Sequence, residues 1–149
     1  MEMTLSQARE LLRQNWETGL DCPCCKQRVQ LYRHKVNSQI TKCLIDMYHI
    51  DREWVHILHE LKPTNRMYSL ARFWGLIEAK GDEPHNNSMS SGFWRLTDKG
   101  KKFVLGECLI PKYAYIFNDK VYRLSEEMVS VESCLGSKFS YPELMGRLV

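Results

Sequence analysis

The stretch from residue 74 to residue 100 constrains the fold of this 149-residue chain more than any other part. Gly75 follows an apolar helical stripe, at the position where a helix commonly ends in a left-handed residue. Residues 76–80 and 93–96 read as two strands, and the loop between them is polar, without apolar periodicity. Thr97 can then cap a further helix. The pattern predicts a helix, a β-hairpin with a long loop, and a second helix.

Length and composition indicate a soluble globular protein. Hydrophobic residues make up 44% of the chain and charged residues 26%, which is the usual balance of a folded domain. No apolar run approaches the roughly 18 residues that span a bilayer. The N-terminus has neither the basic start nor the apolar stretch of a secretory signal. We therefore expect a cytoplasmic protein that makes no contact with a membrane.

Positive charge is concentrated in two segments, although the net charge of the chain is only +3. Residues 62–80 carry four basic residues against one acidic residue, and residues 93–103 have the same balance. Residues 37–61 and 107–149 are each net negative. Basic segments attract nucleic-acid phosphates, but they also form ordinary solvated faces. Charge alone leaves both interpretations open.

Three apolar stripes at helical spacing predict helices in the first half of the chain. The stripes are Leu5, Ala8, Leu12 and Trp16 in residues 4–18; Ile40, Cys43, Leu44, Met47 and Tyr48 in residues 37–48; and Met67, Leu70, Ala71 and Trp74 in residues 65–74. Because Cys43 belongs to its stripe, we interpret it as a core cysteine. One helical turn is expected over residues 58–62, where Pro63 ends it.

The last third of the chain has a different pattern. Two β-rich runs, residues 113–117 and 121–124, flank Asn118-Asp119, which predicts a tight hairpin. Ser130 is expected to cap a short helix, and a terminal helix is expected from about Pro142. This part of the chain thus reads as an extension of the domain before it.

Residues 37–105 resemble the winged helix-turn-helix domains of small prokaryotic and phage regulators. The resemblance rests on two runs, LARFWGLIE at residues 70–78 and WRLTDKGKKF at residues 94–103. It covers under half of the chain, and its Leu-Thr-x-Lys-Gly core is typical of the junction between a wing and the next helix. The resemblance implies a recognition helix at residues 64–74 and a wing at residues 81–92.

Together these observations predict an α+β protein in three parts. Residues 37–106 form the winged helix-turn-helix core, residues 1–36 an N-terminal helix with a cysteine knuckle, and residues 107–149 a C-terminal extension of hairpin and helix. The expected function is binding of double-stranded DNA as a regulator or accessory protein, of phage or prokaryotic origin, that acts by occupying its site.

The outer face of the helix over residues 65–74 carries side chains that suit a DNA groove. Arginine can hydrogen-bond guanine and asparagine can hydrogen-bond adenine, whereas tyrosine, serine and basic side chains can bind phosphates. An ordinary amphipathic surface helix has the same pattern, and the order of the flanking elements favours DNA. The predicted contacts to base edges are Asn65, Ser69 and Arg72. The predicted contacts to phosphates are Arg66, Tyr68, Arg95, Lys99, Lys101 and Lys102.

Two departures from the family favour an alternative function, a protein-interaction module such as a viral inhibitor of a host complex. The helix before the recognition helix is short, and the wing carries Asp82 and Glu83 but no lysine or arginine. Acidic side chains repel phosphates, so this wing suits a protein partner, and so do the aromatic residues of the C-terminal hairpin. A homodimer joined through residues 4–18 and 113–149 is compatible with either function.

The cysteine run Cys22-Pro23-Cys24-Cys25 contains a C-x-x-C pair, Cys22 and Cys25. Two thiolates at this spacing can hold one structural zinc ion from a tight turn, but such a site needs four ligands. His34 is the nearest candidate for a third ligand. Free thiols and a redox pair are the alternatives, because the sequence offers no second C-x-x-C pair.

Enzyme motifs are not found in the sequence. It contains no glycine-rich phosphate loop, no Gly-x-Ser-x-Gly run and no His-Glu-x-x-His run. No nucleophile is paired with a base by any recognisable spacing. We therefore do not expect an enzyme.

Overall fold

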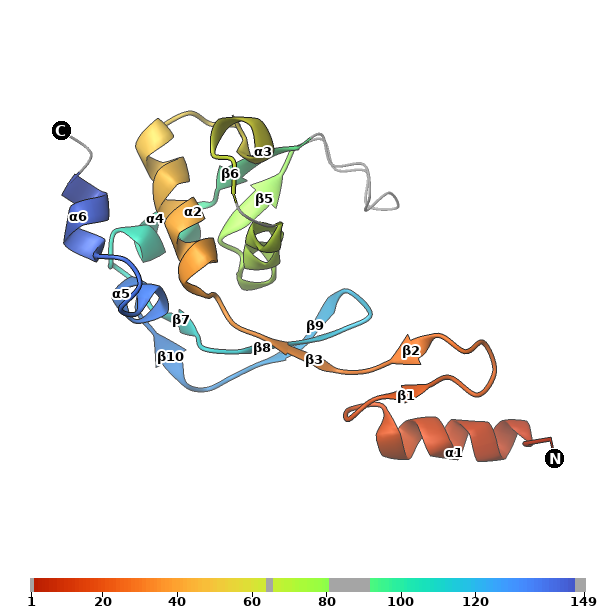
Figure 1. The fold of residues 1–149 in the computed structure, drawn as a ribbon. Helices are drawn as coiled ribbons and strands as arrows, with labels where there is room; N and C mark the ends of the chain where they lie inside the picture. Colours follow the sequence, from red (N-terminus) through yellow and green to blue (C-terminus); the bar gives the residue numbers. More distant parts are fainter. Residues whose placement is uncertain (1, 64–65, 81–91, 147–149) are drawn as a thin grey trace.

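The computed structural model describes residues 2–63, 66–80 and 92–146, and it has a mixed α+β fold with small antiparallel sheets (Figure 1). The elements in chain order are α1 (Leu5–Asn15), β1 (Leu20–Asp21), β2 (Arg28–Val29), β3 (Tyr32–His34), α2 (Ser38–Ile50), β4 (Val55–His56), α3 (Ile57–Glu60), η1 (Met67–Trp74), β5 (Ile77–Ala79), β6 (Phe93–Leu96), α4 (Asp98–Val104), β7 (Ile110–Pro111), β8 (Ala114–Phe117), β9 (Lys120–Leu124), β10 (Met128–Val129), α5 (Val131–Leu135) and α6 (Tyr141–Met145). No helix in the described residues is long and apolar enough to cross a membrane. The expected α+β class is confirmed.

Helix α2 forms the centre of the core. The side chain of Asn37 accepts a hydrogen bond from the backbone N–H of Ile40 at 2.9 Å and starts the helix, and Asp51 follows its end in the left-handed conformation. The buried residues of α2 are Ile40, Thr41, Cys43, Leu44, Ile45 and Met47. They pack against η1, α4, α5 and α6. The helix predicted around residues 37–48 is therefore confirmed, with Cys43 in the core.

The hairpin predicted after Gly75 is present as an antiparallel strand pair. β5 and β6 pair with Ile77 opposite Leu96 and Glu78 opposite Arg95, and β4 joins the other edge of β6. Gly75 has a φ of 72°, the left-handed conformation that the sequence predicts. The order of helix, strand, strand and helix is thus confirmed around the loop.

The helix before Gly75 differs from the expected α-helix. η1 is a 3-10 helix of eight residues, with three residues per turn instead of 3.6. That spacing puts Tyr68, Ala71 and Trp74 on one buried face. Met67, a core residue in the α-helical interpretation, is 39% exposed, and Tyr68, an outer residue in it, is 7% exposed. Both predictions are wrong because they assume the α-helical period.

A second sheet joins the first and last parts of the chain, in the order β3-β8-β9. Arg33 of β3 lies opposite Tyr115 of β8, which lies opposite Arg123 of β9. The turn between β8 and β9 is Asn118-Asp119, with positive φ values of 52° and 61°, as a tight type I′ turn requires. The predicted hairpin is confirmed, and the strand that pairs with the other edge of β8, β3, comes from the N-terminal segment.

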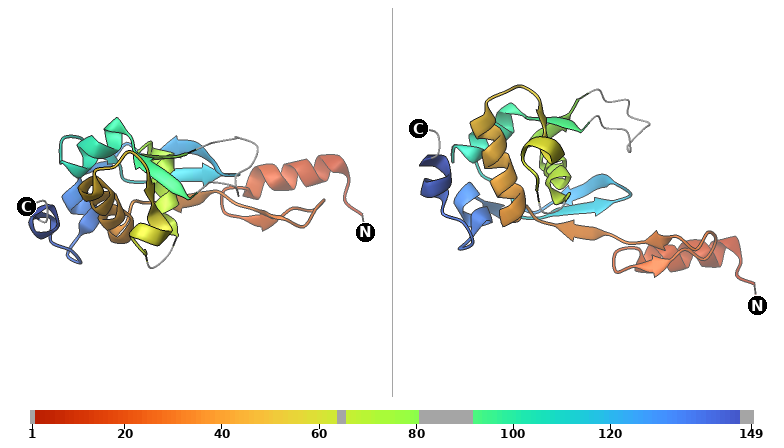
Figure 2. Two further views of the ribbon diagram at one scale, coloured as in Figure 1. Left: turned by 90° about the horizontal axis from the view of Figure 1, so that it is seen from above. Right: turned by 45° about the horizontal axis from the view of Figure 1, so that its top comes forward.

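The two helices predicted near the C-terminus are also confirmed. Ser130 caps α5 by accepting the backbone N–H of Ser133 at 3.2 Å, and Ser140 caps α6. Nε2 of His49 in α2 lies 2.7 Å from the carbonyl oxygen of Leu144 in α6. These short helices complete the cover over one side of α2, as Figure 2 shows from two further directions.

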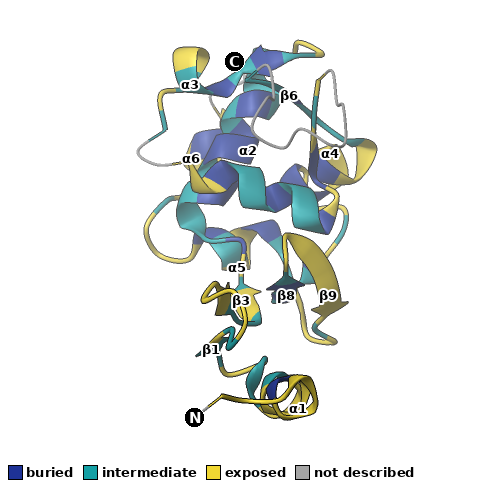
Figure 3. Ribbon diagram, turned by 90° about the vertical axis from the view of Figure 1, so that its right-hand side faces the viewer, coloured by how far each residue is buried: buried dark blue, intermediate teal, exposed yellow. Residues whose placement is uncertain are grey.

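Helix α1 and the β1–β2 hairpin form an arm that extends from this body (Figures 1 and 2). Thr4 caps α1 through a capping box, yet Ala8 is the only buried residue of the helix, and most of it is exposed (Figure 3). The ring of Trp16 meets the rings of Phe117 and Tyr122 edge-on, with centroids 5.1 and 5.0 Å away. This aromatic contact holds the arm to the C-terminal hairpin.

Candidate nucleic-acid interface

Helix α4 begins where β6 ends, and Thr97 fixes that junction. Its side-chain oxygen accepts the backbone N–H of Gly100 at 3.0 Å, and its hydroxyl donates to the carbonyl of Gly75. Its own N–H donates to the carbonyl of Leu76 at 3.0 Å. A side chain at Gly100 would place its Cβ 2.1 Å from that same carbonyl oxygen. The glycine of the Leu-Thr-x-Lys-Gly run is therefore required by the close approach of α4 to the start of β5.

Three exposed lysines project from α4, and we call Lys99, Lys101 and Lys102 the lysine face. The same helix buries Phe103 and Val104 completely, so one side is fixed in the core and the other is left to solvent. Within the described part of the chain, no salt bridge engages the three ammonium groups. Exposed Asp98 lies on the same helix, so the lysine face is a net positive surface that can attract phosphates.

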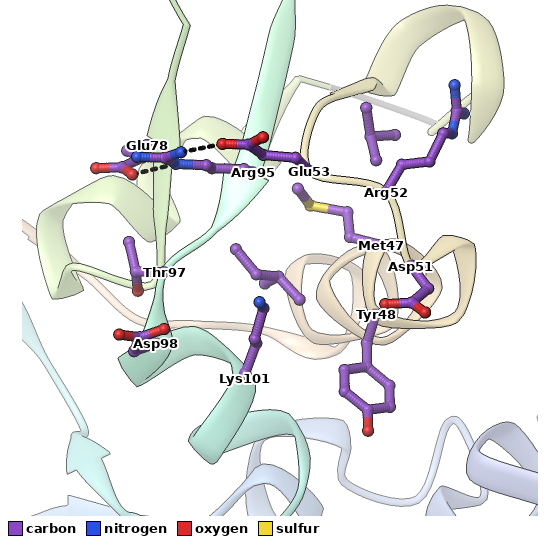
Figure 4. A pocket seen from close by; sticks show the side chains of 12 residues that line it. Met47, Tyr48, Asp51, Arg52, Glu53, Glu78, Arg95, Thr97, Asp98 and Lys101 are labelled. Atoms are coloured by element: carbon purple, nitrogen blue, oxygen red, sulfur yellow. Dashed lines mark hydrogen bonds and ion pairs between the residues drawn. The ribbon is translucent and has the colours of Figure 1, made fainter.

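A hollow of about 680 Å³ lies beside the lysine face, between the end of α2, the β5–β6 pair and the start of α4 (Figure 4). Its lining mixes both signs of charge. The charged residues are Asp51, Arg52, Glu53, Glu78, Arg95, Asp98 and Lys101. Lys101 reaches into this space from α4, across from Asp51 (Figure 4). A nucleic-acid phosphate that approached Lys101 here would also meet carboxylates, so the hollow adds no net positive charge to the lysine face.

Arg95, a predicted phosphate contact, is held between two carboxylates at the wall of the hollow (Figure 4). It donates hydrogen bonds to Glu78, directly opposite on β5, and to Glu53 at 2.7 Å. Its guanidinium also lies over the ring of Trp54, 4.6 Å from the centroid. The hydrogen bond with Glu78 raises the pKa of Arg95 further. Its positive charge is thus largely engaged within the protein.

Arg72, a predicted contact to a base edge, is bound to the C-terminal hairpin. Its Nη2 donates to Oδ1 of Asp119 at 2.7 Å, and its Nη1 donates to the carbonyl of Ser69 at 3.0 Å. The guanidinium lies over the ring of Phe73, 4.2 Å from the centroid, and the side chain is 34% exposed. A DNA base could take the guanidinium only by displacing Asp119.

The other predicted contacts near η1 differ in accessibility. Arg66 is exposed, and Ser69 is half-buried with its hydroxyl donating to the Arg66 carbonyl at 3.2 Å. Tyr68 is buried in the core, where burial raises the pKa of its hydroxyl, so its predicted phosphate contact is withdrawn. Asn65 and residues 81–91 of the predicted wing lie outside the described residues.

The predicted zinc ligands are not brought together as one group. Cys22 and Cys25 lie in the turn between β1 and β2, whereas His34 lies on β3, which pairs with β8. Burial lowers the pKa of His34. Among the residues that the structure describes, no group of three or more histidine, cysteine, aspartate or glutamate side chains could hold a metal ion. One chain offers a pair of thiols here and not a four-ligand site.

Sequence reasoning misses the acidic partners of the two arginines. A signal exists for Glu78, because pairing of the two predicted strands places it near Arg95, and opposite charges on paired strands attract. Asp119 reads only as a turn residue, and its contact with Arg72 spans 47 residues of sequence. No local pattern reveals a contact of that range.

Comparison of the chain with known proteins gives no matching family model, no matching curated protein and no matching solved structure.

Proposed function

We propose that the protein binds double-stranded DNA through a winged-helix arrangement and acts as a regulator or accessory factor by occupying its site. The lysine face is the observation that carries this proposal. Lys99, Lys101 and Lys102 are all exposed on α4 and have no salt-bridge partner in the described residues. Lysines that neutralise phosphates release counterions from the duplex, which gives affinity independent of sequence.

The order of elements supports the winged-helix arrangement. α2, α3 and η1 precede the β5–β6 pair, β4 completes a sheet in the order β4-β6-β5, and α4 follows. However, α3 is a single turn of four residues and η1 is a 3-10 helix. We therefore assign phosphate binding to the lysine face and Arg66. We assign base contacts to Ser69 and Arg72. Arg72 can make its contact once its ion pair with Asp119 is broken.

A titration of a labelled random-sequence duplex, followed by fluorescence anisotropy at two salt concentrations, tests this proposal. Phosphate binding predicts a steep loss of affinity with salt, with a slope of about 0.9 per phosphate contact on logarithmic axes. Binding that is insensitive to salt would remove the role of the lysine face. An absence of binding at low salt would remove the proposed function.

A second candidate function, a protein-interaction module, is favoured by strand β9. It is an edge strand of the β3-β8-β9 sheet, and Val121, Tyr122 and Leu124 on it are 40%, 56% and 42% exposed. An exposed apolar edge can accept an added strand from a partner. Two results together would favour this function. The parent chain would fail to bind DNA but would capture a specific protein, and the Leu124→Lys variant would no longer capture that protein.

A further inference from the structure

The turn between β1 and β2 is a preformed holder for two thiolates. β1 and β2 pair with Asp21 opposite Arg28. Inside that pair, the N–H of Cys22 donates to the carbonyl of Gln27 at 2.8 Å, and the N–H of Lys26 donates to the carbonyl of Cys22 at 2.9 Å. Lys26 adopts a left-handed φ of 68° to close the turn. The backbone around the thiols is thus fixed by hydrogen bonds before any metal arrives.

The thiols of this turn are accessible to a metal ion. Cys22 is half-buried, and Cys24 and Cys25 are exposed. The thiolate is the form that binds metal. Cys22 and Cys25 have the C-x-x-C spacing that reaches one ion from a single turn.

The turn cannot complete a structural zinc site within one chain. Such a site is closed by four ligands in tetrahedral geometry, and C-x-x-C supplies two. The nearest predicted ligand, His34, belongs to β3 and the second sheet, and the described residues contain no three-ligand group. Cys24 is adjacent to Cys25, so a relaxed turn does not direct both sulfurs at one ion. If the pair holds zinc in a closed site, the two further ligands come from another molecule.

The position of the turn makes a second copy of the chain the fitting source. The turn lies on the arm, away from the α2-centred core (Figures 1 and 2), so two arms can approach without a clash between bodies. On the adjacent helix α1 and just before it, Met3, Leu5 and Leu11 are 48%, 60% and 36% exposed, and a paired arm would cover some of these apolar side chains. If two copies are related by a twofold axis through the metal, each contributes one C-x-x-C pair, and the assembly stops at a dimer.

We propose that one zinc ion joins two copies of this chain, with Cys22 and Cys25 of each copy as its four ligands. Each thiol loses its proton to solvent on binding, and no electron is transferred. Exposed Lys26 lies next to Cys25 in each turn and offsets the excess negative charge of four thiolates around one divalent ion. Cys24 stays free. The inference is independent of the proposed DNA binding.

The test measures zinc content and molar mass on the same sample. The reduced full-length chain is incubated with zinc chloride, passed through a size-exclusion column with light scattering, and assayed for zinc in the eluted peak. The expected result is one zinc ion per two chains in a dimer, which a chelator converts to monomer. One zinc ion per monomer, zinc-free protein, or a dimer that the chelator leaves intact would each overturn the proposal.

Single substitutions assign the ligands. Cys22→Ser and Cys25→Ser should each lose the zinc ion and the dimer, whereas Cys24→Ser and the distant Cys108→Ser should keep both. The circular dichroism of each variant should match that of the parent chain, because the turn lies outside the core. Cobalt loading of the parent should give the visible bands of a tetrahedral thiolate site. Retention of zinc and dimer by Cys25→Ser, or their loss in Cys24→Ser, would contradict this ligand set.

Discussion

Arg72 and Asp119 form a hydrogen-bonded ion pair, 2.7 Å long, that joins η1 to the turn of the β8–β9 hairpin. The arginine side chain is 34% exposed and the aspartate side chain 55%. An exposed pair of this kind contributes roughly 0.2–1 kcal/mol, so a DNA base or phosphate can compete with it. The C-terminal hairpin is therefore placed to determine whether Arg72 is available to a ligand.

Release of Arg72 should strengthen DNA binding. Asp119→Asn removes the carboxylate but keeps a residue that tolerates the left-handed turn. We expect the affinity for a random duplex at low salt to rise by up to about fivefold, because breaking an exposed ion pair costs at most about 1 kcal/mol, which corresponds to that factor. Anisotropy titrations measure the change.

The control for this prediction is the double variant Arg72→Ala with Asp119→Asn, compared with Arg72→Ala alone. If the freed arginine binds DNA, Asp119→Asn should have little effect once Arg72 is gone. An equal rise in affinity in both backgrounds would mean that Asp119 acts only by repelling phosphates.

Gly100→Ala should destabilise the fold. The added Cβ would lie 2.1 Å from the backbone carbonyl oxygen of Leu76, and such overpacking costs about 1–3 kcal/mol, more than the helix propensity that alanine gains. Gly146→Ala is the matched control, because its φ is −65° and its Cβ meets no described atom within 4 Å. Urea unfolding should show a loss for the first variant and a change under about 0.5 kcal/mol for the second. Equal midpoints would contradict the close approach.

Removal of the Thr97 side chain should weaken the junction between β6 and α4. Thr97→Ala loses the hydrogen bond from the N–H of Gly100 and the bond to the Gly75 carbonyl, and loss of such a cap costs about 1 kcal/mol. Thr97→Ser keeps the hydroxyl and should retain most of the stability in the same unfolding assay. A serine variant as unstable as the alanine variant would show that the methyl group, and not the cap, is responsible.

Buried thiols should make stability fall at high pH. Burial, with a smaller effect of Asp46, raises the pKa of Cys43 from 9.0 to about 12, and burial raises that of Cys134 to about 11. Because the pKa of each thiol is higher in the folded protein than in the unfolded chain, the folded state favours the protonated thiol. This contribution to stability is complete below a pH of about 9, the pKa of the unfolded thiol, and is lost as the pH rises through the pKa values of the folded protein. The free energy of unfolding, measured by urea titration, should therefore decrease as the pH rises above about 9. A free energy that stays constant there would contradict the burial of Cys43 and the partial burial of Cys134.

Thiol modification gives an independent check on Cys43. At pH 8 in the presence of a chelator, exposed Cys24 should react quickly with iodoacetamide, because the thiolate is the reactive form. Cys43 should react only after unfolding. Mass spectrometry of digested protein locates the label, and equal labelling of the two cysteines in the folded protein would place Cys43 outside the core.

Local patterns in the sequence are sufficient to predict most elements of this fold. Asn37 and Thr97 cap helices, and Gly75 and Asn118-Asp119 take the left-handed conformations that their turns require. Each of these features depends on the chemistry of a few consecutive residues. The pairing of β5 with β6 was predictable for the same reason.

The interface could be predicted only in part, because two of its determinants are not local. Because η1 is a 3-10 helix, Tyr68 and not Met67 lies in the core, and the apolar pattern of the sequence alone does not reveal that winding. The engagement of Arg72 by Asp119 depends on the fold of the whole chain. The exposed lysines of α4 were predictable, since Phe103 and Val104 fix the inward side of that helix.

The role of the lysine face is tested most directly by the salt dependence of duplex binding in a charge-matched pair of variants. The first variant changes Lys99, Lys101 and Lys102 to glutamine. The second changes Arg9, Lys120 and Lys138, which are exposed elsewhere, to glutamine and has the same net charge. We predict that the first variant loses affinity and that its salt slope falls by about 0.9 for each phosphate contact removed, while the second keeps the parent slope. Equal slopes in both variants would contradict a DNA-binding role for α4.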